Sequence, residues 1–484
     1  MAAVKSYKFG DPSAPAFSDD FEIVKKAVLQ VTDIKTNHNK YYAIELHKGT
    51  AKGKPAYRVF THYGRTDDLE SNPNAGQKEC RFATTEGEAS AIYQSIYNEK
   101  TSPRKGYKEV SLASSKIGSQ KARGTSSGTI DAKTVQRLAD AKAAKGEAIP
   151  VMRHDLSPEV VDLIRYIYDE ATNALTTTVN VKITANGIET PLGILTLGQI
   201  EKGEAILQEL YKLFQSGAKG GAKSRSKMED LSGEFYSAIP HRIGRTREAI
   251  QSAIIDSMED FESKQETLQL MKDMLQVNGD AGSVLYDSEA GAKYDALKCK
   301  VAAVPRGSSV YKEIADHVVK SQVKFHGIKV GQIFTLKRDG EHEVFTDHIP
   351  DQRLLFHGSR IKNWVGILSR GILLPKIVVS MGVNRTDAGW LGNGIYFGDA
   401  SCTSAFYTSP GKRNTRYMAL ARVALGKRKE YTKITYGITE PPAGYHSCHG
   451  VRNQKGVSSQ FADDEYVIYD GRQQRLEYLV EFTM

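Results

Sequence analysis

The sequence predicts a multidomain α+β protein, and three observations support this fold class. The chain has 484 residues, which is the length of about three ordinary domains. Hydrophobic residues make up 40% of the chain and charged residues 25%, as in folded globular proteins. Strand-like and helix-like stretches are grouped in blocks rather than alternating, which argues against a doubly wound parallel sheet.

Residues 1–112 predict a small domain built from a β-sheet and a helix. The stretches KYYAIELHKG and AYRVFTHYGR are rich in aromatic and β-branched residues, which is typical of strands. Thr84 and Thr85 are candidate N-caps for a helix in the stretch TTEGEASAIYQSIYNEKT. Residues 113–150 contain SSKIGSQKARGTSSGT, with almost no large apolar side chain, and predict a flexible basic linker.

Residues 151–280 predict an all-α domain. The stretch LSPEVVDLIRYIYDEA has Ser157 as a helix N-cap and Pro158 at the first helical position, followed by apolar residues at helical spacing. Residues 281–484 contain short, spaced strands such as GQIFTLKR, GIYFGD and EYVIYD. They predict an α+β domain with two packed antiparallel sheets.

Composition limits the classes of partner and compartment. The net charge of +9 permits a nucleic-acid partner, although a solvated basic surface explains it equally well. The four cysteines form no CxxC pair, so neither a zinc finger nor a disulfide framework is expected, and HSCHG lacks a second ligand cluster. No apolar run approaches the roughly 20 residues of a membrane span. We expect an intracellular, soluble protein, in the nucleus if eukaryotic and in the cytoplasm or nucleoid if bacterial.

The stretch LLFHGSR ends a predicted strand with His357, Gly358 and Ser359. A glycine after a strand lets a ligand approach the backbone, so Gly358 can offer its N–H and C=O to a planar amide. Ser359 adds a hydroxyl to the same edge, and a ring nitrogen of His357 can hold a sugar hydroxyl. The tripeptide by itself is a weak signal because it is common by chance.

Two further stretches carry candidate site residues. GWLGNGIYFGDASCTSAFY contains Tyr396, Ser404 and Tyr407, and two tyrosines near one docking edge can sandwich a flat cationic ring. Its GWLGNG turn does not fit GxGxxG and precedes a strand, which argues against a dinucleotide fold. DDEYVIYD places Glu465 at the start of an apolar strand, where the carboxylate is either solvated or presented into a cleft.

Together the three stretches resemble, in order and content, the His–Tyr–Glu signature of the poly(ADP-ribose) polymerases, which have a diphtheria-toxin-like ADP-ribosyltransferase fold. PLGILTLGQI and LSGEFYSAIPH resemble the helical regulatory domain of the DNA-dependent members. YRVFTHYGR resembles their WGR domain, with Tyr63 in place of the tryptophan. The modules occur in the order typical of the family and cover most of the chain.

By this resemblance, NAD⁺ is expected as the substrate, with no metal, and its nicotinamide end is expected to meet four residues. The backbone of Gly358 should hold the carboxamide, with a further hydrogen bond from Ser404. Tyr407 should stack on the nicotinamide ring, and Tyr396 should cover its other side.

The resemblance also implies roles toward the rest of NAD⁺. His357 should bind the adenosine ribose, and Ser359 and Asn363 match positions that contact the adenosine side. Glu465 should hydrogen-bond the nicotinamide-ribose 2′-hydroxyl, stabilise the developing positive charge and orient the acceptor hydroxyl during elongation. Preorganised charge of this kind is usually the largest catalytic term.

The implied activity is a DNA-break-stimulated poly(ADP-ribose) polymerase that modifies acceptor proteins, including itself, and is restrained by its helical domain. Mono-ADP-ribosylation, or a DNA-end-binding adaptor with little catalysis, are the alternatives. We expect a monomer that binds nicks or ends with a 5′-phosphate and needs no membrane. An accessory factor that completes the acceptor site is a further candidate partner, and the sequence leaves the need for it open. The candidate DNA contacts are Tyr63, Arg65, Lys105 and Lys108.

Overall fold

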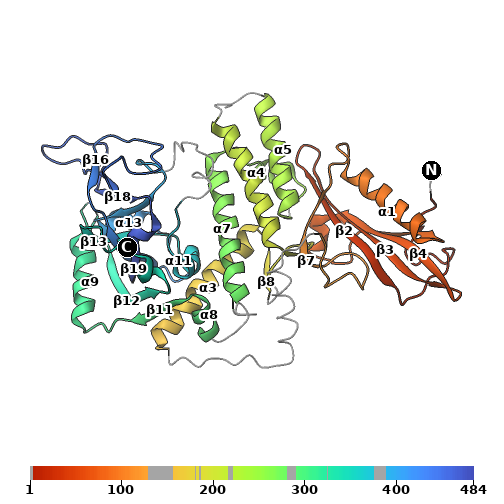
Figure 1. Ribbon diagram of the computed structural model, residues 1–484, viewed down its shortest axis with the longest axis horizontal. Coiled ribbons are helices and arrows are strands. Elements are labelled where there is room, and N and C mark those ends of the chain that lie inside the picture. Colours follow the sequence, from red (N-terminus) through yellow and green to blue (C-terminus); the bar gives the residue numbers. More distant parts are fainter. Residues whose placement is uncertain are drawn as a thin grey trace. The chain divides into compact units, whose positions relative to one another are not determined.

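The computed structural model describes residues 4–128, 156–179, 181–184, 187–215, 222–241, 243–280, 290–323, 325–374 and 389–484. These residues form two compact units (Figure 1). The first consists of Met1–Ile149 and Leu175–Ser283, and the second of Pro150–Ala174 and Val284–Met484. Among the described residues, no helix combines the length and the apolar character that a membrane crossing requires.

The first unit begins with a six-stranded antiparallel sheet in the order β1-β5-β4-β3-β2-β6, with helix α1 packed against β3, β4 and β5. The Thr85 side chain caps α1 by accepting a hydrogen bond from the Glu88 N–H, as the sequence predicts. Buried side chains from α1 and the sheet, including Tyr93, Tyr42 and Val59, form its core. The elements are β1 Tyr7–Lys8, β2 Glu22–Asp33, β3 His38–Ala51, β4 Lys54–Arg65, η1 Thr66–Leu69, β5 Gln77–Ala83, α1 Glu86–Thr101 and β6 Lys108–Glu109.

The expected flexible linker is wrong for residues 113–128, which are folded. Strand β7 (Leu112–Ser115) pairs with β10 (Gly193–Leu195), and the Ser119 N–H donates to the buried Glu45 carboxylate over 2.8 Å. Gly118 lies so close to Glu45 that a Cβ atom would collide with its carboxylate. The small residues of this segment therefore allow close packing rather than flexibility. Residues 129–150 of the expected linker lie outside the described residues.

The helical part of the first unit is not all-α, which corrects the expectation for residues 151–280. Strands β8, β9 and β10 form a four-stranded sheet with β7. Gly193, at φ +146°, supplies the backbone conformation of the turn between β9 and β10. The elements are β7 Leu112–Ser115, β8 Lys182–Thr184, β9 Gly187–Glu189, β10 Gly193–Leu195, α4 Leu197–Gln215, α5 Ala222–Ala238, α6 Arg247–Ser252 and α7 Met258–Asp280.

The second unit contains a nine-stranded sheet in the order β11-β12-β19-β15-β13-β14-β18-β17-β16, with helices between strands. Its elements are α3 Pro158–Val179 up to Ala174, α8 Ala290–Ala296, β11 Cys299–Ala303, α9 Ser309–Lys320, β12 Lys329–Arg338, α10 Glu341–Val344, β13 Gln352–Gly358, η4 Ile361–Asn363, α11 Trp364–Arg370, β14 Ile395–Gly398, α13 Ser401–Phe406, β15 Arg416–Ala424, β16 Arg428–Tyr431, β17 Ser447–Gly450, β18 Glu465–Ile468, η5 Gly471–Gln473 and β19 Gln474–Thr483.

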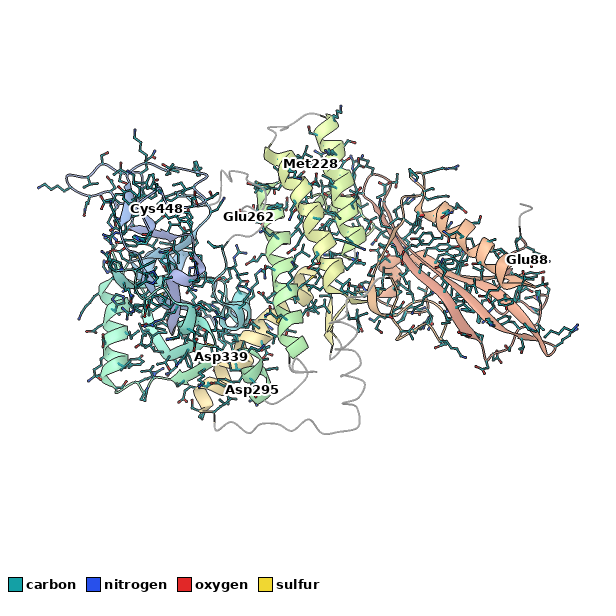
Figure 2. All side chains as sticks on the ribbon, in the orientation of Figure 1. Glu88, Met228, Glu262, Asp295, Asp339 and Cys448 are labelled. Atoms are coloured by element: carbon teal, nitrogen blue, oxygen red, sulfur yellow. The ribbon has the colours of Figure 1, made fainter. Side chains whose placement is uncertain are left out.

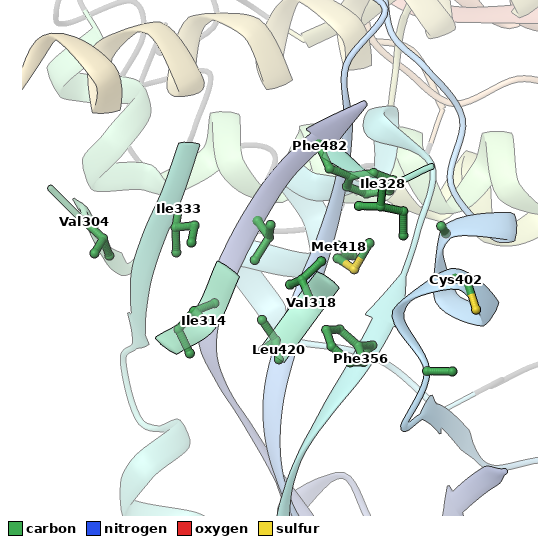
Figure 3. Packing of buried hydrophobic residues seen from close by; sticks show 13 residues of the cluster. Val304, Ile314, Val318, Ile328, Ile333, Phe356, Cys402, Met418, Leu420 and Phe482 are labelled. Atoms are coloured by element: carbon green, nitrogen blue, oxygen red, sulfur yellow. The ribbon is translucent and has the colours of Figure 1, made fainter. Parts of the chain in front are cut away.

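The two expected antiparallel sheets are the two halves of this one sheet. The halves meet between β13 and β14, where Phe356 opposite Gly398 is the single paired position. The expectation of antiparallel pairing is wrong for β16 and β17, which run parallel. The larger half is covered by α9, whose Val318 packs with Phe356, Met418 and Leu420 in a buried cluster (Figure 3).

Candidate functional site

The strand register brings the three sequence motifs of the second unit to one place. Phe356 of β13 lies opposite Gly398 of β14, and Gly398 lies opposite Glu465 of β18. On the other side of Glu465 lies Gly450 of β17, the strand whose Cys448 is labelled in Figure 2. Opposed residues of an antiparallel pair share a face, so Glu465 stands between two positions without side chains. The Phe461 ring fills the space over Gly450, whereas a Cβ atom on Gly398 would meet no atom closer than 3.4 Å, so the open side of Glu465 is the one toward Gly398.

Gly358 is required by the close approach of helix α13. A Cβ atom at this position would collide with the carbonyl oxygen of Ser404 and would lie 3.2 Å from Thr408 Cγ2. Ser404 itself is buried, at 4% exposure, and its Oγ lies near Gly398. The first and second motifs are therefore in direct contact, and the backbone of Gly358 and the hydroxyl of Ser404 lie at the same edge.

The side chain of Tyr396 is held by hydrogen bonds, whereas that of Tyr407 is exposed. The Tyr396 hydroxyl donates to the Gly392 carbonyl over 2.8 Å and accepts from the Leu391 N–H over 2.9 Å, so the loop before β14 fixes the ring. Tyr407, at the C-terminal end of α13, is 66% exposed and offers its ring to a ligand. Burial raises the pKa of Tyr396, and the nearby charge of Glu465 acts in the same direction on the pKa of Tyr396 and of Tyr407. All three groups thus lie within electrostatic reach of one another.

His357 lies on β13, beside the backbone of β14. Its Nδ1 is 3.0 Å from the Tyr396 carbonyl oxygen, which can only accept, so Nδ1 carries the proton and Nε2 is the acceptor of the neutral ring. Burial lowers the pKa of His357, partly offset by this hydrogen bond. Asn363 donates to Ser359 Oγ over 3.2 Å, which joins these two candidate residues just after the strand.

Glu465 is the carboxylic acid among the candidate site residues. Burial, and then the charge of Asp463, raise its pKa to about 7. A carboxyl with such a pKa is poised to exchange a proton near neutral pH, which is a common property of catalytic acids and bases.

A charged network beside Glu465 was missed at the level of sequence. Thr403 donates to Asp463 over 2.6 Å, and Arg452 Nη2 lies 2.9 Å from Asp399. Arg452 Nε also lies 3.8 Å from Asp463 and 3.7 Å from Asp464. One cation thus faces three carboxylates around the catalytic candidate. The adjacent aspartates in DDEYVIYD were the available signal, but the sequence gives no partner for them.

The six-stranded sheet of the first unit carries a cavity of about 600 Å³. Tyr63, Arg65 and Lys105, three of the four candidate DNA contacts, line it, whereas Lys108 in β6 does not. The Tyr63 ring stacks on Tyr42 with centroids 5.2 Å apart. Cationic residues that sequence reasoning missed also line the cavity: Lys40, Arg81, Lys100 and Arg104.

Some charges of this cavity are already engaged. Arg65 donates to the Asn37 carbonyl over 2.9 Å and pairs with Asp67 over 3.1 Å. Glu79 lines the cavity too and accepts a hydrogen bond from the Tyr63 hydroxyl over 2.8 Å. The lining nevertheless has an excess of positive charge, which suits an anionic ligand. Within the described residues, no group of three or more His, Cys, Asp or Glu side chains is arranged to hold a metal ion.

Three protein-family models match the chain in order. The WGR domain model matches residues 25–114, the poly(ADP-ribose) polymerase regulatory domain model residues 154–290, and the poly(ADP-ribose) polymerase catalytic domain model residues 308–484. The third match contains every candidate residue of the second unit described above.

Similar proteins carry related names. The protein mono-ADP-ribosyltransferase PARP4 of Mus musculus is 29% identical over 97% of this chain, and that of Homo sapiens is 33% identical over 68%. Poly [ADP-ribose] polymerase 1 of Arabidopsis thaliana is 26% identical over 96% of this chain. The chain spans 21%, 18% and 47% of the length of these three relatives, respectively.

Proposed function

The chain belongs to the poly(ADP-ribose) polymerase family, and we propose that it transfers ADP-ribose from NAD⁺ to protein acceptors. We further propose that it elongates the attached ADP-ribose into a polymer when it binds broken DNA. The observation that carries the enzymatic part is the position of Glu465 between Gly398 and Gly450, beside Ser404 and the tyrosines.

The proposed reaction breaks the bond between nicotinamide and C1′ of the ribose and forms a bond from C1′ to an acceptor oxygen or other nucleophile. Nicotinamide leaves as a neutral molecule, the ribose passes through an oxocarbenium-like state, and the acceptor loses a proton. The open edge at Gly358 suits the carboxamide, and the exposed Tyr407 ring suits stacking on the pyridinium.

Glu465 has two tasks in this proposal. As a carboxylate it hydrogen-bonds a ribose hydroxyl and stabilises the positive charge that develops on the ring. Its pKa of about 7 also allows it to take the acceptor proton at neutral pH. His357, with Nε2 as an acceptor, holds a sugar hydroxyl on the adenosine side.

The test of this proposal is transfer of labelled ADP-ribose from NAD⁺ to protein, with and without nicked, 5′-phosphorylated DNA, resolved on a gel. DNA-dependent material of high mass is the expected result. Absence of label in both lanes contradicts the enzymatic proposal. Normal elongation by a Glu465→Gln variant contradicts the assigned role of Glu465.

Mono-ADP-ribosylation is the second candidate, and a specific observation favours it. Asp399, Asp463 and Asp464 lie near Glu465, and Thr403 is engaged with Asp463. A growing ADP-ribose chain is polyanionic, so these carboxylates oppose its approach as an acceptor. Two of the relatives above are also named mono-ADP-ribosyltransferases. In the gel experiment, a sharp band without high-mass products selects this candidate.

The DNA part of the proposal is supported by the cavity of the first unit. Its cations suit strand phosphates, and the stacked pair Tyr42–Tyr63 offers an aromatic wall to a strand end. Affinity for a 5′-phosphorylated nick should exceed affinity for intact duplex and fall with salt. Equal affinities for the two DNAs contradict break sensing.

A further inference from the structure

One side of helix α3 is attached to a loop of the second unit. Asp162, Tyr166 and Glu170 follow one another at intervals of four residues, so they form a stripe along the helix. All three contact the loop 409–415, which connects α13 to β15. The contacts lie within one compact unit, because α3 belongs to the second unit up to Ala174.

The stripe binds both the backbone and a side chain of the loop. The Glu170 carboxylate, which is 8% exposed, accepts from the Lys412 N–H over 2.7 Å. The Tyr166 hydroxyl accepts from the Arg413 N–H over 3.2 Å. The Arg413 guanidinium lies 4.3 Å from the centre of the Tyr166 ring and forms an ion pair with Asp162. Two backbone donors of the loop thus find their acceptors on a helix far away in the sequence.

The loop is shaped to receive this helix. A Cβ atom on Gly411 would collide with the Tyr166 hydroxyl and would lie 3.0 Å from Glu170 Oε1. The loop is closed on itself by hydrogen bonds from the Gly411 N–H to the Thr415 carbonyl and from the Asn414 N–H to the Gly411 carbonyl. Close fit and internal closure mean that a displacement of α3 moves the loop as a whole.

The loop is short and begins directly at the candidate site. Tyr407 is the C-cap residue that follows α13, and Thr408 lies next to Gly358. Arg416, the first residue of β15, donates to the Thr408 carbonyl over 2.8 Å. The loop is therefore held at Thr408 and Arg416 on the sheet side and at residues 411–413 by α3.

We propose that Asp162, Tyr166 and Glu170 are positioning residues of the catalytic unit, which hold the loop and thereby Ser404 and Tyr407 beside Gly358. This inference rests on the proposed function, because it takes this edge as the nicotinamide site. The family model assigns α3 to the regulatory domain, within residues 154–290. The contacts of the stripe instead give the start of α3 a role that supports NAD⁺ binding, whereas an inhibitory contact would weaken it.

The test measures nicotinamide release by the full chain over a range of NAD⁺ concentrations, in one series with DNA and in a parallel series without it. Glu170→Ala and Gly411→Ala, which disturb the contact from opposite sides, should each raise KM for NAD⁺ about tenfold with a smaller change in kcat. Glu170→Gln keeps an acceptor oxygen and should stay near wild type. Asp169→Ala, an exposed position on the same helix, is the matched control.

Exchanging the charges of the Asp162–Arg413 ion pair distinguishes a positioning role from a loss of folding as the cause of a raised KM. Asp162→Arg and Arg413→Asp should each raise KM, and the double variant should recover much of the loss because it restores the ion pair. Unchanged KM in all variants overturns the proposal, as does higher DNA-free activity, which marks the contact as inhibitory. If the wild type releases no nicotinamide, the proposed function fails. The positioning role of the α3 stripe is then tested separately, by measuring the NAD⁺ affinity of wild type and Glu170→Ala by calorimetry. Equal affinity of wild type and Glu170→Ala, or no binding by either, then overturns it.

Discussion

The Arg452 guanidinium lies 2.9 Å from the carboxylate of Asp399, in a loop that follows the strand opposite Glu465. The same guanidinium lies within 4 Å of Asp463 and Asp464, so a single cation compensates three carboxylates next to the catalytic candidate. His449 Nε2, 2.7 Å from Asp464, is the other basic group of this cluster. The charge balance at Glu465 therefore depends on residues outside the His357, Tyr396 and Glu465 motifs.

Replacing Arg452 should shift the pH dependence of catalysis. In Arg452→Met, the negative charge of Asp463 acts on Glu465 without compensation and raises the pKa of Glu465 further. The midpoint of the acid limb of kcat/KM for nicotinamide release should move up by about 0.5–1 pH unit. Arg452→Lys keeps the charge and should move the midpoint less. An unchanged midpoint in both variants contradicts the electrostatic role.

The wild-type pH profile should itself reveal Glu465. Because the reactive form is the carboxylate and its pKa is about 7, kcat/KM should fall as the pH drops below this value. The slope should approach a tenfold loss per pH unit on the acid side. A flat profile between pH 5 and 8, measured with buffers of constant ionic strength, contradicts the assignment.

Glu465→Gln should lose activity and gain stability. Removing a preorganised charge typically costs about a hundredfold or more in rate. The native pKa of Glu465 is raised above its ordinary value of 4.5, so the native state disfavours the carboxylate. This penalty is absent below pH 4.5, grows as the pH rises and is complete above about 7. The variant should therefore unfold at a higher temperature at pH 8, by a few degrees for about 1–2 kcal/mol, and the gain should vanish near pH 4.

Gly358→Ala should damage the candidate site through its backbone. The new Cβ collides with the Ser404 carbonyl, so α13 must move, at a cost of about 1–3 kcal/mol in stability. KM for NAD⁺ should rise because the movement of α13 displaces Ser404 from the Gly358 backbone. Gly398→Ala is the control for stability, because its Cβ meets neighbours at an ordinary 3.4 Å or more. Equal melting temperatures and KM values for Gly358→Ala and wild type contradict this reasoning.

Removing cations from the cavity of the first unit should weaken DNA binding. Lys100→Ala and Arg104→Ala should each lower affinity for a nicked duplex and reduce the slope of log K against log salt by about one. Lys108→Ala, outside the cavity lining, should leave both values unchanged. Fluorescence anisotropy at several salt concentrations measures both quantities. A larger effect from Lys108 than from Lys100 and Arg104 moves the DNA site elsewhere.

The block organisation of the fold could be predicted from sequence because strand and helix patterns are local. The linker could not, since a run of serine and glycine looks the same whether it is flexible or packed. The backbone N–H groups of Gly118 and Ser119 donate to the buried side chains of His62 and Glu45, which are distant in sequence. The strands at 182–195 were missed because they are three residues long and rely on glycine turns.

In the candidate site, too, the residues that stand in local motifs could be predicted and those brought together by tertiary packing could not. His357, Tyr396 and Glu465 each stand in a distinctive local motif, and their order along the chain resembles a known signature. Arg452 and Asp399 carry no such motif, and their meeting depends on how the loops after β14 and β17 close. Arg81 and Lys100 similarly reach one cavity from a strand and a helix, a convergence set by tertiary packing.

The single paired position between β13 and β14 has a mechanical consequence. The two halves of the nine-stranded sheet share one row, at Phe356 and Gly398, and the candidate site lies at this row. A ligand that touches Gly358 on one half and Glu465 on the other acts as a cross-link between them. Occupancy should therefore make the halves unfold together, so that the width of the melting transition, and not only its midpoint, reports binding.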